Sequence, residues 1–215
     1  MRSRFLALSL LASAWVFGIL TEDTVNQQQM SAVDLKVSSF LHARATPFFS
    51  ILMLAITYFG SLAVTGGIAL ASGLVLWWRG QSDRVWLLSF AVPTGMLING
   101  MVKLLVNRPR PVFENPLLTL SSYSFPSGHA MAATVVYGLF AAFALQTSRD
   151  LQHRIAAVSI AALLIGLVCF SRLYLGVHYL TDVLAGIAEG IAWLACCLAL
   201  VRIKQQRSAG AQKNT

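Results

Sequence analysis

Six stretches of the sequence are apolar and almost free of charge, and each is close in length to a membrane-spanning helix. A helix needs about 20 such residues to cross the hydrocarbon core of a bilayer. The sequence therefore predicts an all-α fold, an integral membrane six-helix bundle formed by residues 1–204. The expected spans are 5–20, 48–78, 85–106, 128–146, 155–171 and 181–201, and residues 205–215 are expected to form a disordered, polar cytoplasmic tail.

The composition excludes the main soluble classes. Of the 215 residues, 57% are hydrophobic and 11% are charged, whereas a soluble domain carries roughly 25% charged residues. A disordered chain is low in hydrophobicity and high in charge, and a disulfide scaffold is dense in cysteine. The cysteines Cys169, Cys196 and Cys197 lie inside apolar runs, so we expect buried thiols.

Three segments depart from a simple series of spans. Residues 2–14 resemble a secretory signal with a small-residue cleavage site, but apolar residues continue beyond it, so we expect an uncleaved span. The run 48–78 is long for one crossing, and its glycines, among them Gly60, allow close packing or a bend. Ser31 and Asp34 have capping-box spacing. The residues after them predict either a short amphipathic helix on the outer surface or a plain connector.

The basic residues indicate the orientation of the bundle. The net charge is +8, and Lys and Arg in short loops mark the cytoplasmic face. With a cytoplasmic N-terminus, ten of the 16 basic residues fall on the inner side and six on the outer side. Four of those six crowd beside span ends: Lys103, Arg108, Arg110 and Arg172. We therefore expect both termini to be cytoplasmic, and we attribute the positive charge to topology rather than to binding of nucleic acid.

Three short polar clusters gather at span ends on the outer face. They occupy residues 103–111, 125–129 and 171–182. Ionisable residues at membrane depth are costly, and by default they mark functional sites. Taken singly, these side chains could snorkel, bind lipid headgroups or form interfacial hydrogen bonds. Three such sets on one face favour a shared site.

The cations of these clusters indicate an anionic ligand. Lys103, Arg110 and Arg172 would repel one another in a partly desolvated site that held no anion. Arginine binds planar oxyanion edges, and lysine acts as a compact charge. Ser127 is a favourable N-cap and Gly128 allows close approach, so the fourth span would present free N–H groups to a phosphate.

Two histidines supply nucleophilic and acid–base chemistry. His178 and Asp182 are four residues apart, hence on one helix face if the sixth span begins near Gly176. The carboxylate would fix the tautomer of His178 and leave the other ring nitrogen free to act as a nucleophile. His129 would then donate a proton to the leaving group and take one from water.

The three clusters resemble the signature of the type 2 phosphatidic acid phosphatase family. The matching patterns are Lys-x6-Arg-Pro from Lys103, Pro-Ser-Gly-His from Pro126 and Ser-Arg-x5-His-x3-Asp from Ser171. The family includes bacterial lipid phosphatases and is similar at its active site to vanadium haloperoxidases and glucose-6-phosphatase. Every motif position is matched, and the six spans fit the family's membrane layout.

The resemblance implies a role for each motif residue. His178 would form a phosphohistidine, Asp182 would orient it, and His129 would be the general acid. The phosphate would be bound by Lys103, Arg110, Ser127, Gly128 and Arg172. No metal or cofactor is implied, because the cations replace it. Arg108 lies outside the motif, so we expect it to support the site from behind or to bind headgroups.

Together with these patterns, the resemblance implies a metal-independent lipid phosphatase whose site faces the periplasmic or extracellular side of a bacterial inner membrane. The substrate would reach the site from the bilayer. The resemblance favours undecaprenyl diphosphate, followed by phosphatidylglycerol phosphate and phosphatidic acid. Two alternatives stay open, a lipid phosphotransferase that uses the same site and, in a different class, an anion transporter. A transporter needs a polar path to both faces, whereas the cluster lies on one.

Several residues outside the motifs also allow predictions about their surroundings. Glu189 in the sixth span either acts as a second functional carboxylate or pairs within the bundle. His42 and His153 lie in polar connections and are expected to be solvated. Trp77 and Trp78, just before Arg79, are expected to anchor the span at the membrane interface, as is Tyr123 at the other surface.

Overall fold

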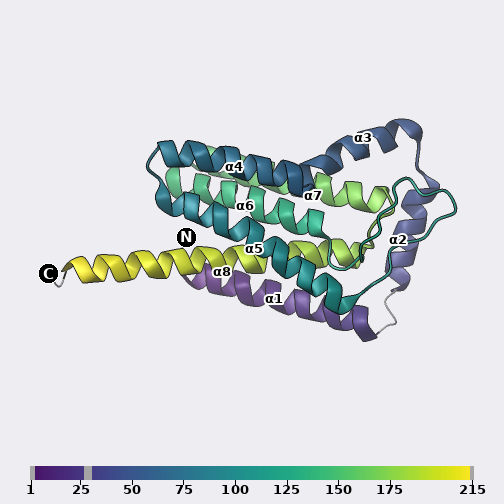
Figure 1. The fold of residues 1–215 in the computed structure, drawn as a ribbon, viewed down its shortest axis with the longest axis horizontal. Coiled ribbons are helices and arrows are strands. Elements are labelled where there is room, and N and C mark those ends of the chain that lie inside the picture. The colour runs from purple at the N-terminus through teal and green to yellow at the C-terminus, as the bar shows by residue number, and fades with distance from the viewer. Residues whose placement is uncertain (1–2, 27–30, 214–215) are drawn as a thin grey trace.

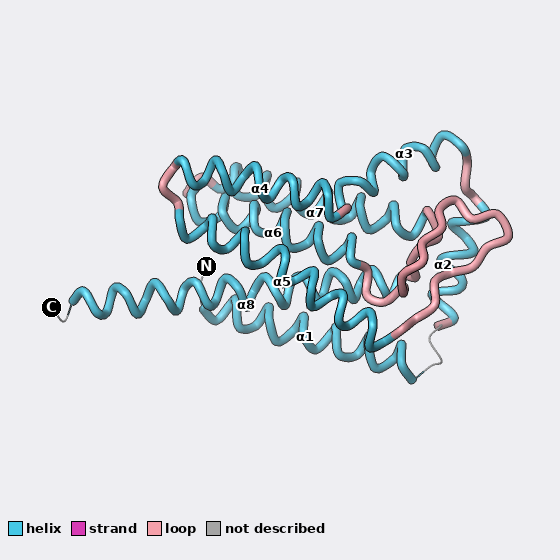
Figure 2. Tube along the Cα trace, viewed as in Figure 1, coloured by secondary structure: helices cyan, strands magenta, loops and turns pink. Residues whose placement is uncertain are grey.

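The computed structural model of the protein describes residues 3–26 and 31–213, and within them all regular structure is helical (Figures 1 and 2). The predicted all-α class is therefore confirmed. The elements are α1 (Ser3–Asn26), α2 (Ala32–Ala43), α3 (Pro47–Thr57), the 3-10 turn η1 (Tyr58–Gly60), α4 (Leu62–Trp78), α5 (Ser82–Val106), α6 (Gly128–Thr147), α7 (Leu151–Tyr174) and α8 (Leu180–Lys213).

The described helices supply five or six candidate membrane spans, where the apolar runs predict six. Five helices are each long and apolar enough to cross a bilayer: α1, α5, α6, α7 and α8. The run from α3 through η1 to α4 bends by 46° and is a sixth candidate, either as a broken span or as a re-entrant loop. Ser61 is extended at this point, and its Oγ caps α4 by accepting from the Val64 N–H at 3.3 Å. Of the two possibilities stated for the glycines of this run, close packing or a bend, the structure shows a bend next to Gly60.

Helix α6 lies at the centre of the bundle, where it contacts α4, α5, α7 and α8. In its most apolar stretch 67% of the residues are buried, compared with 11% in α1, which packs along α8 at the edge (Figure 1). The outer faces of the other spans remain apolar and exposed; Leu105 and Trp78 are examples. A helix that is apolar on its exposed face is suited to contact with lipid tails rather than water.

The ends of four helices that carry the polar clusters meet at one end of the bundle. They are the last turns of α5 and α7 and the first turns of α6 and α8, which lie beside α2 and the long loop 107–127 (Figures 1 and 2). Both ends of the described chain point to the opposite end (Figure 1). The two termini therefore share one side of the membrane; that this side is cytoplasmic stays a prediction.

Two polar segments, the connection before α3 and the C-terminal tail, form helices. Residues 32–43 form the predicted short helix, α2, whose N-cap Ser31 accepts from the Asp34 N–H at 3.1 Å. The expectation of a disordered tail is wrong for the described part, because α8 continues to Lys213. The tail contains Lys, Gln, Arg and Ala but no proline, and such residues extend a helix once a span has started it. Residues 214–215 lie outside the described part of the chain.

Candidate active site

The His178 ring lies between a carboxylate and a guanidinium. Its Nδ1 is 3.3 Å from Asp182 Oδ2, and its Nε2 is 3.3 Å from a terminal nitrogen of Arg110. A carboxylate can only accept, so the neutral ring carries its proton on Nδ1 and its lone pair on Nε2. His178 is 2% exposed. The structure therefore holds a buried imidazole with its lone pair directed at a cation.

The chain path that brings His178 to Asp182 differs from the predicted one. Helix α8 begins at Leu180, not near Gly176, so His178 precedes the helix. Gly176 has a φ of +67° and turns the chain between α7 and α8, a conformation that glycine adopts without strain. Asp182 sits in the first turn of α8, where its Oδ2 also accepts from the Tyr179 N–H at 2.8 Å, as in a capping box. The pair is formed by a turn and a helix start rather than by one helix face.

Burial determines the charge of His178. It lowers the pKa of His178 from 6.5 to about 3, with the positive charges of Arg172 and Arg110 acting in the same direction and Asp182 acting against them. The charged ring would lose its hydration in this place. His178 is therefore neutral at pH 7, which is the form in which Nε2 can attack an electrophile.

Two of the predicted phosphate ligands are oriented by backbone carbonyls of the loop before α6 and of the turn before α8. Lys103 Nζ donates to Tyr123 O and to Pro126 O, each at 2.8 Å. Arg110 donates to Ser122 O at 2.6 Å, and also to Val177 O at 2.5 Å, next to His178. Carbonyl oxygens orient these cations without neutralising them. Both positive charges thus remain for an incoming anion.

The third cation, Arg172 at the end of α7, is 2% exposed. One of its terminal nitrogens donates to Thr57 Oγ1 at 2.7 Å. Among the described residues, its Nε–H finds no acceptor. Its charge acts on both His129 and His178, so it lies near both rings. A buried guanidinium with an unsatisfied donor is costly, and a phosphate oxygen would satisfy it.

The start of α6 is fixed against α8 at the same place. Ser127 is the N-cap, as predicted, and its Oγ accepts from the Ala130 N–H at 3.5 Å. The Ser127 N–H itself donates to Asp182 O at 2.9 Å. A Cβ at Gly128 would lie 3.1 Å from Asn99 Oδ1, so packing inside the bundle is one reason for this glycine. Close approach of a ligand to Gly128 stays a prediction.

His129 follows in the first turn of α6. The positive charges of Arg172, Arg110 and Lys103 all act on its ring. With His129, the structure has brought every predicted catalytic and phosphate-binding residue to one end of the bundle. The roles implied for them remain predictions.

Arg108, the basic residue outside the motif, is buried with 1% exposure and pairs with Asp182, the carboxylate that faces His178. One terminal nitrogen lies 2.5 Å from Asp182 Oδ1 and the other 2.7 Å from Asp34 Oδ2. Of the two expected roles, headgroup binding does not fit a side chain enclosed between two carboxylates.

Three residues of the site were not predicted from the sequence: Asp34, Ser124 and Thr181. Ser124 Oγ donates to Asp182 Oδ2. Thr181 Oγ1 donates to Asp34 Oδ2 at 2.6 Å. The sequence assigns Asp34 only to a helix cap, yet its carboxylate is completely buried. The one available signal was a carboxylate on a short helix next to the outer cluster.

The structure also shows the surroundings of the three polar residues singled out outside the motifs. Glu189 accepts from Asn99 Nδ2 at 2.7 Å inside the bundle, which favours the second of its two readings. His153 is solvated as predicted, with 79% of its side chain exposed. The prediction for His42 is wrong, because Phe113 of the 107–127 loop stacks on its ring with centroids 3.9 Å apart.

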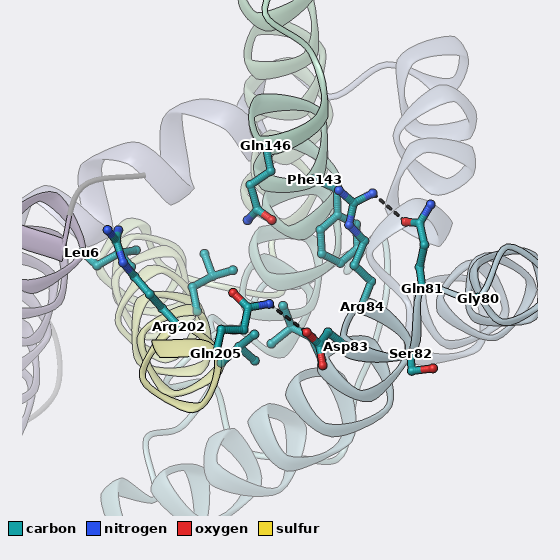
Figure 3. Close-up of a pocket in the computed structure, with 13 residues that line it drawn as sticks. Leu6, Gly80, Gln81, Ser82, Asp83, Arg84, Phe143, Gln146, Arg202 and Gln205 are labelled. Atoms are coloured by element: carbon teal, nitrogen blue, oxygen red, sulfur yellow. Dashed lines mark hydrogen bonds between the residues drawn. The ribbon is translucent and has the colours of Figure 1, made fainter. Parts of the chain in front are cut away.

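Two cavities differ in their relation to the site. A groove of about 530 Å³ runs between α2 and residues 109–113 and reaches Arg110. Another, of about 610 Å³, lies at the opposite end of the bundle, where Arg84 donates to Gln81 and Gln205 donates to Asp83 (Figure 3). None of the predicted site residues lines this second cavity, whereas the groove touches a predicted phosphate ligand.

The sequence is similar to phosphatases of membrane lipids. Residues 84–206 match the PAP2 superfamily. Phosphatidylglycerophosphatase B of Bacillus subtilis is 31% identical over 182 residues, which are 83% of this chain and 88% of the relative. Lipid A 1-phosphatase of Rhizobium johnstonii is 33% identical over 140 residues, which cover 61% of this chain and 51% of the relative.

The fold is similar to a solved structure as well. A crystal structure of a transmembrane PAP2-type phosphatidylglycerolphosphate phosphatase from Bacillus subtilis superposes with a TM-score of 0.80 at 30% identity. The match covers 93% of this chain and 96% of the other. The helical architecture described above is thus shared over almost its whole length.

Proposed function

Because the chain belongs to the PAP2 superfamily of membrane lipid phosphatases, we propose that it removes phosphate from a lipid phosphate or diphosphate through a phosphohistidine on His178. The observation that supports this most is the arrangement of His178, with Nδ1 at Asp182 and Nε2 at Arg110. A neutral imidazole oriented by a carboxylate, with its lone pair beside a phosphate-binding cation, is suited to attack on phosphorus.

In the first step, Nε2 of His178 bonds to the terminal phosphorus, and the bond from that phosphorus to the leaving oxygen breaks. This oxygen is the lipid oxygen of a monophosphate or the bridging oxygen of a diphosphate. His129 donates a proton to that leaving oxygen. The positive charge that develops on the His178 ring is stabilised through Nδ1–H by Asp182. In the second step, a water attacks phosphorus, His129 takes a proton from it, and the P–N bond breaks to release inorganic phosphate.

The cations act on the phosphoryl group while it is transferred. Lys103, Arg110 and Arg172 bind its equatorial oxygens, and the N-terminal turn of α6 at Ser127 and Gly128 adds backbone donors. Electrostatic stabilisation of this kind needs donors that are already in place. The carbonyl contacts of Lys103 and Arg110 and the buried position of Arg172 support such a role.

We propose that the reaction needs no metal ion. Among the described residues, no group of three His, Cys, Asp or Glu side chains is arranged to hold one. The three cations carry positive charge of the kind that Mg²⁺ supplies in other phosphoryl-transfer sites.

The substrate headgroup would reach the site from the side, while its chain stays in the bilayer. The groove beside Arg110 is lined mainly by apolar and hydroxyl side chains, with Lys36 at its edge. We favour undecaprenyl diphosphate, followed by phosphatidylglycerol phosphate and phosphatidic acid. The relatives named above act on different lipids, so the shared residues define the phosphate chemistry more than the lipid. We place the site on the periplasmic side of a bacterial inner membrane.

Phosphate release from these three lipids by the purified protein in EDTA tests the proposal. We expect His178→Ala to abolish turnover and His129→Ala to lower it severely. His153→Ala is the matched control, because this histidine is exposed at the opposite end of the bundle and should keep full activity. Full activity of His178→Ala, or strict dependence on added Mg²⁺, would contradict the proposal. Transfer of phosphate to a second lipid instead of water would identify a phosphotransferase.

A further inference from the structure

A buried ion network connects helix α2 to the carboxylate that faces His178. Asp34, Arg108 and Asp182 are each at most 1% exposed. The two terminal nitrogens of Arg108 divide between the carboxylates, at 2.7 Å from Asp34 and 2.5 Å from Asp182. Buried charges persist in proteins when they are paired and hydrogen-bonded. Three segments distant in sequence are therefore held in one fixed arrangement.

Thr181 gives Asp34 a second connection to the same carboxylate. Its Oγ1 accepts from Arg108 at 2.7 Å and donates to Asp34 Oδ2 at 2.6 Å. Its backbone N–H donates to Asp34 Oδ1 at 3.0 Å. Because Thr181 directly precedes Asp182, Asp34 fixes the backbone of this helix start as well as the arginine.

We propose that Asp34 is a positioning residue for phosphoryl transfer and acts through Arg108 and Thr181 on Asp182. The inference rests on the proposed function, in which Asp182 orients His178. The two oxygens of Asp182 have separate partners, since Oδ1 accepts from Arg108 and Oδ2 faces His178. Arg108 thereby holds the carboxylate against rotation, and Asp34 holds Arg108.

Asp34 also affects the charge that His178 meets. Arg108 paired with Asp182 alone would neutralise that carboxylate. Shared with Asp34, the arginine leaves a formal charge of −1 on the group of two carboxylates and one guanidinium. The His178 ring becomes positive when Nε2 bonds to phosphorus, so this negative charge stabilises the transition state more than the resting state.

Asp34 does not serve as a phosphate ligand in this arrangement. Both of its oxygens accept hydrogen bonds, from Arg108 and Thr181, and a carboxylate would repel a phosphate. Its loss should therefore lower kcat and leave KM nearly unchanged, because Lys103, Arg110 and Arg172 stay in place.

The test measures kcat and KM of the purified full chain with a short-chain phosphatidic acid in micelles. Asp34→Asn keeps the shape of the side chain but removes its charge, and we expect kcat to fall about tenfold or more, with KM within about threefold. Thr24→Val is the matched control, because Thr24 is buried near the end of α1, does not line the groove, and its hydroxyl donates to the Leu20 carbonyl of its own helix. It should keep kcat within about twofold.

Combination with Asp182→Asn separates positioning from a general loss of structure. If Asp34 acts through Asp182, Asp34→Asn should cost less than about threefold when Asp182 is already Asn, because coupled residues are not additive. Equal losses in both backgrounds would show that Asp34 only supports the fold, and would overturn the proposal. Wild-type kcat in Asp34→Asn would overturn it as well.

A milder pair of variants decides the question if Asp34→Asn does not fold. Thr181→Val removes the hydroxyl that joins Arg108 to Asp34, whereas Thr181→Ser keeps it. We expect kcat to fall about fivefold in the first and to recover in the second; equal kcat in both would refute the inference. Activity of His178→Ala separates the two proposals. If that variant is active, the proposed function fails, and if it is inactive while Asp34→Asn and Thr181→Val are unaffected, only this inference fails.

Discussion

Arg172 allows the clearest separation of function from stability. It is buried at the site, its one described side-chain partner is the neutral hydroxyl of Thr57, and its Nε–H has no acceptor among the described residues. An uncompensated buried charge destabilises a fold, and an apolar side chain of similar length removes that cost. Arg172→Met should therefore lower activity without lowering the stability of the free protein.

The expected size of the activity loss follows from the hydrogen bonds that phosphate would receive. A hydrogen bond to a charged group contributes about 1.5–3 kcal/mol. If the Nε–H and one further N–H bind the phosphate, their loss raises the barrier by about 3–6 kcal/mol. At about 1.4 kcal/mol per factor of ten, kcat/KM should fall by roughly 10²- to 10⁴-fold. Arg172→Lys keeps the charge but not the planar fork, and its activity should lie between the two proteins.

The assay pairs phosphate release with thermal unfolding in the same detergent. We expect the unfolding temperature of Arg172→Met to equal or exceed that of the wild type. Adding inorganic phosphate should stabilise the wild type more than the variant, because only the wild type keeps this ligand for the anion. Full activity of Arg172→Met would show that Arg172 does not bind the phosphate. An unfolding temperature several degrees lower would show that Arg172 stabilises the bundle, and would contradict the prediction that its buried charge is uncompensated.

Two further predictions concern pH and topology. The pKa of His178 is lowered from 6.5 to about 3 by burial, so the unfolded chain binds a proton that the folded chain does not, and stability should fall as pH decreases from about 6.5 towards 3, by about 2 kcal/mol at pH 5. His178→Gln should flatten this part of the stability profile, and an unchanged slope would refute the assignment. For topology, a cysteine at Asn115 should react with an impermeant thiol reagent in intact cells, whereas one at Arg149 should react only after lysis; the reverse pattern would invert the orientation.

The fold class and the set of residues that gather at the candidate site could be predicted from the sequence because both depend on local patterns. A bilayer requires long apolar helices whose backbone groups are satisfied internally, so charge-poor runs of this length predict membrane-spanning helices. Within such a sequence, ionisable residues are rare enough to stand out. The pairing of His178 with Asp182 and the cap at Ser127 were predictable because each involves residues close together in the chain.

The boundaries and bends of the elements were less predictable. The break between α3 and α4 and the continuation of α8 to Lys213 depend on whether a polar or glycine-containing stretch stays helical once a helix has started. Composition leaves that undecided, because propensities differ by less than about 1 kcal/mol per residue for most residue types. The stacking of Phe113 on His42 depends on how the long loop folds back, which no local pattern specifies.

The sequence by itself determined an all-helical membrane protein with three polar motifs at helix ends, because the bilayer restricts the backbone to helices and leaves few places for charge. Only the tertiary structure decided which side chains surround the carboxylate of Asp182. From the sequence, Asp34 is predicted only as part of a helix cap, and Arg108 only as a cation outside the motif. Folding places both at Asp182, in a buried network that depends on the packing of α2 against the start of α8. Long-range contacts of this kind arise from packing, which is not encoded in any single segment.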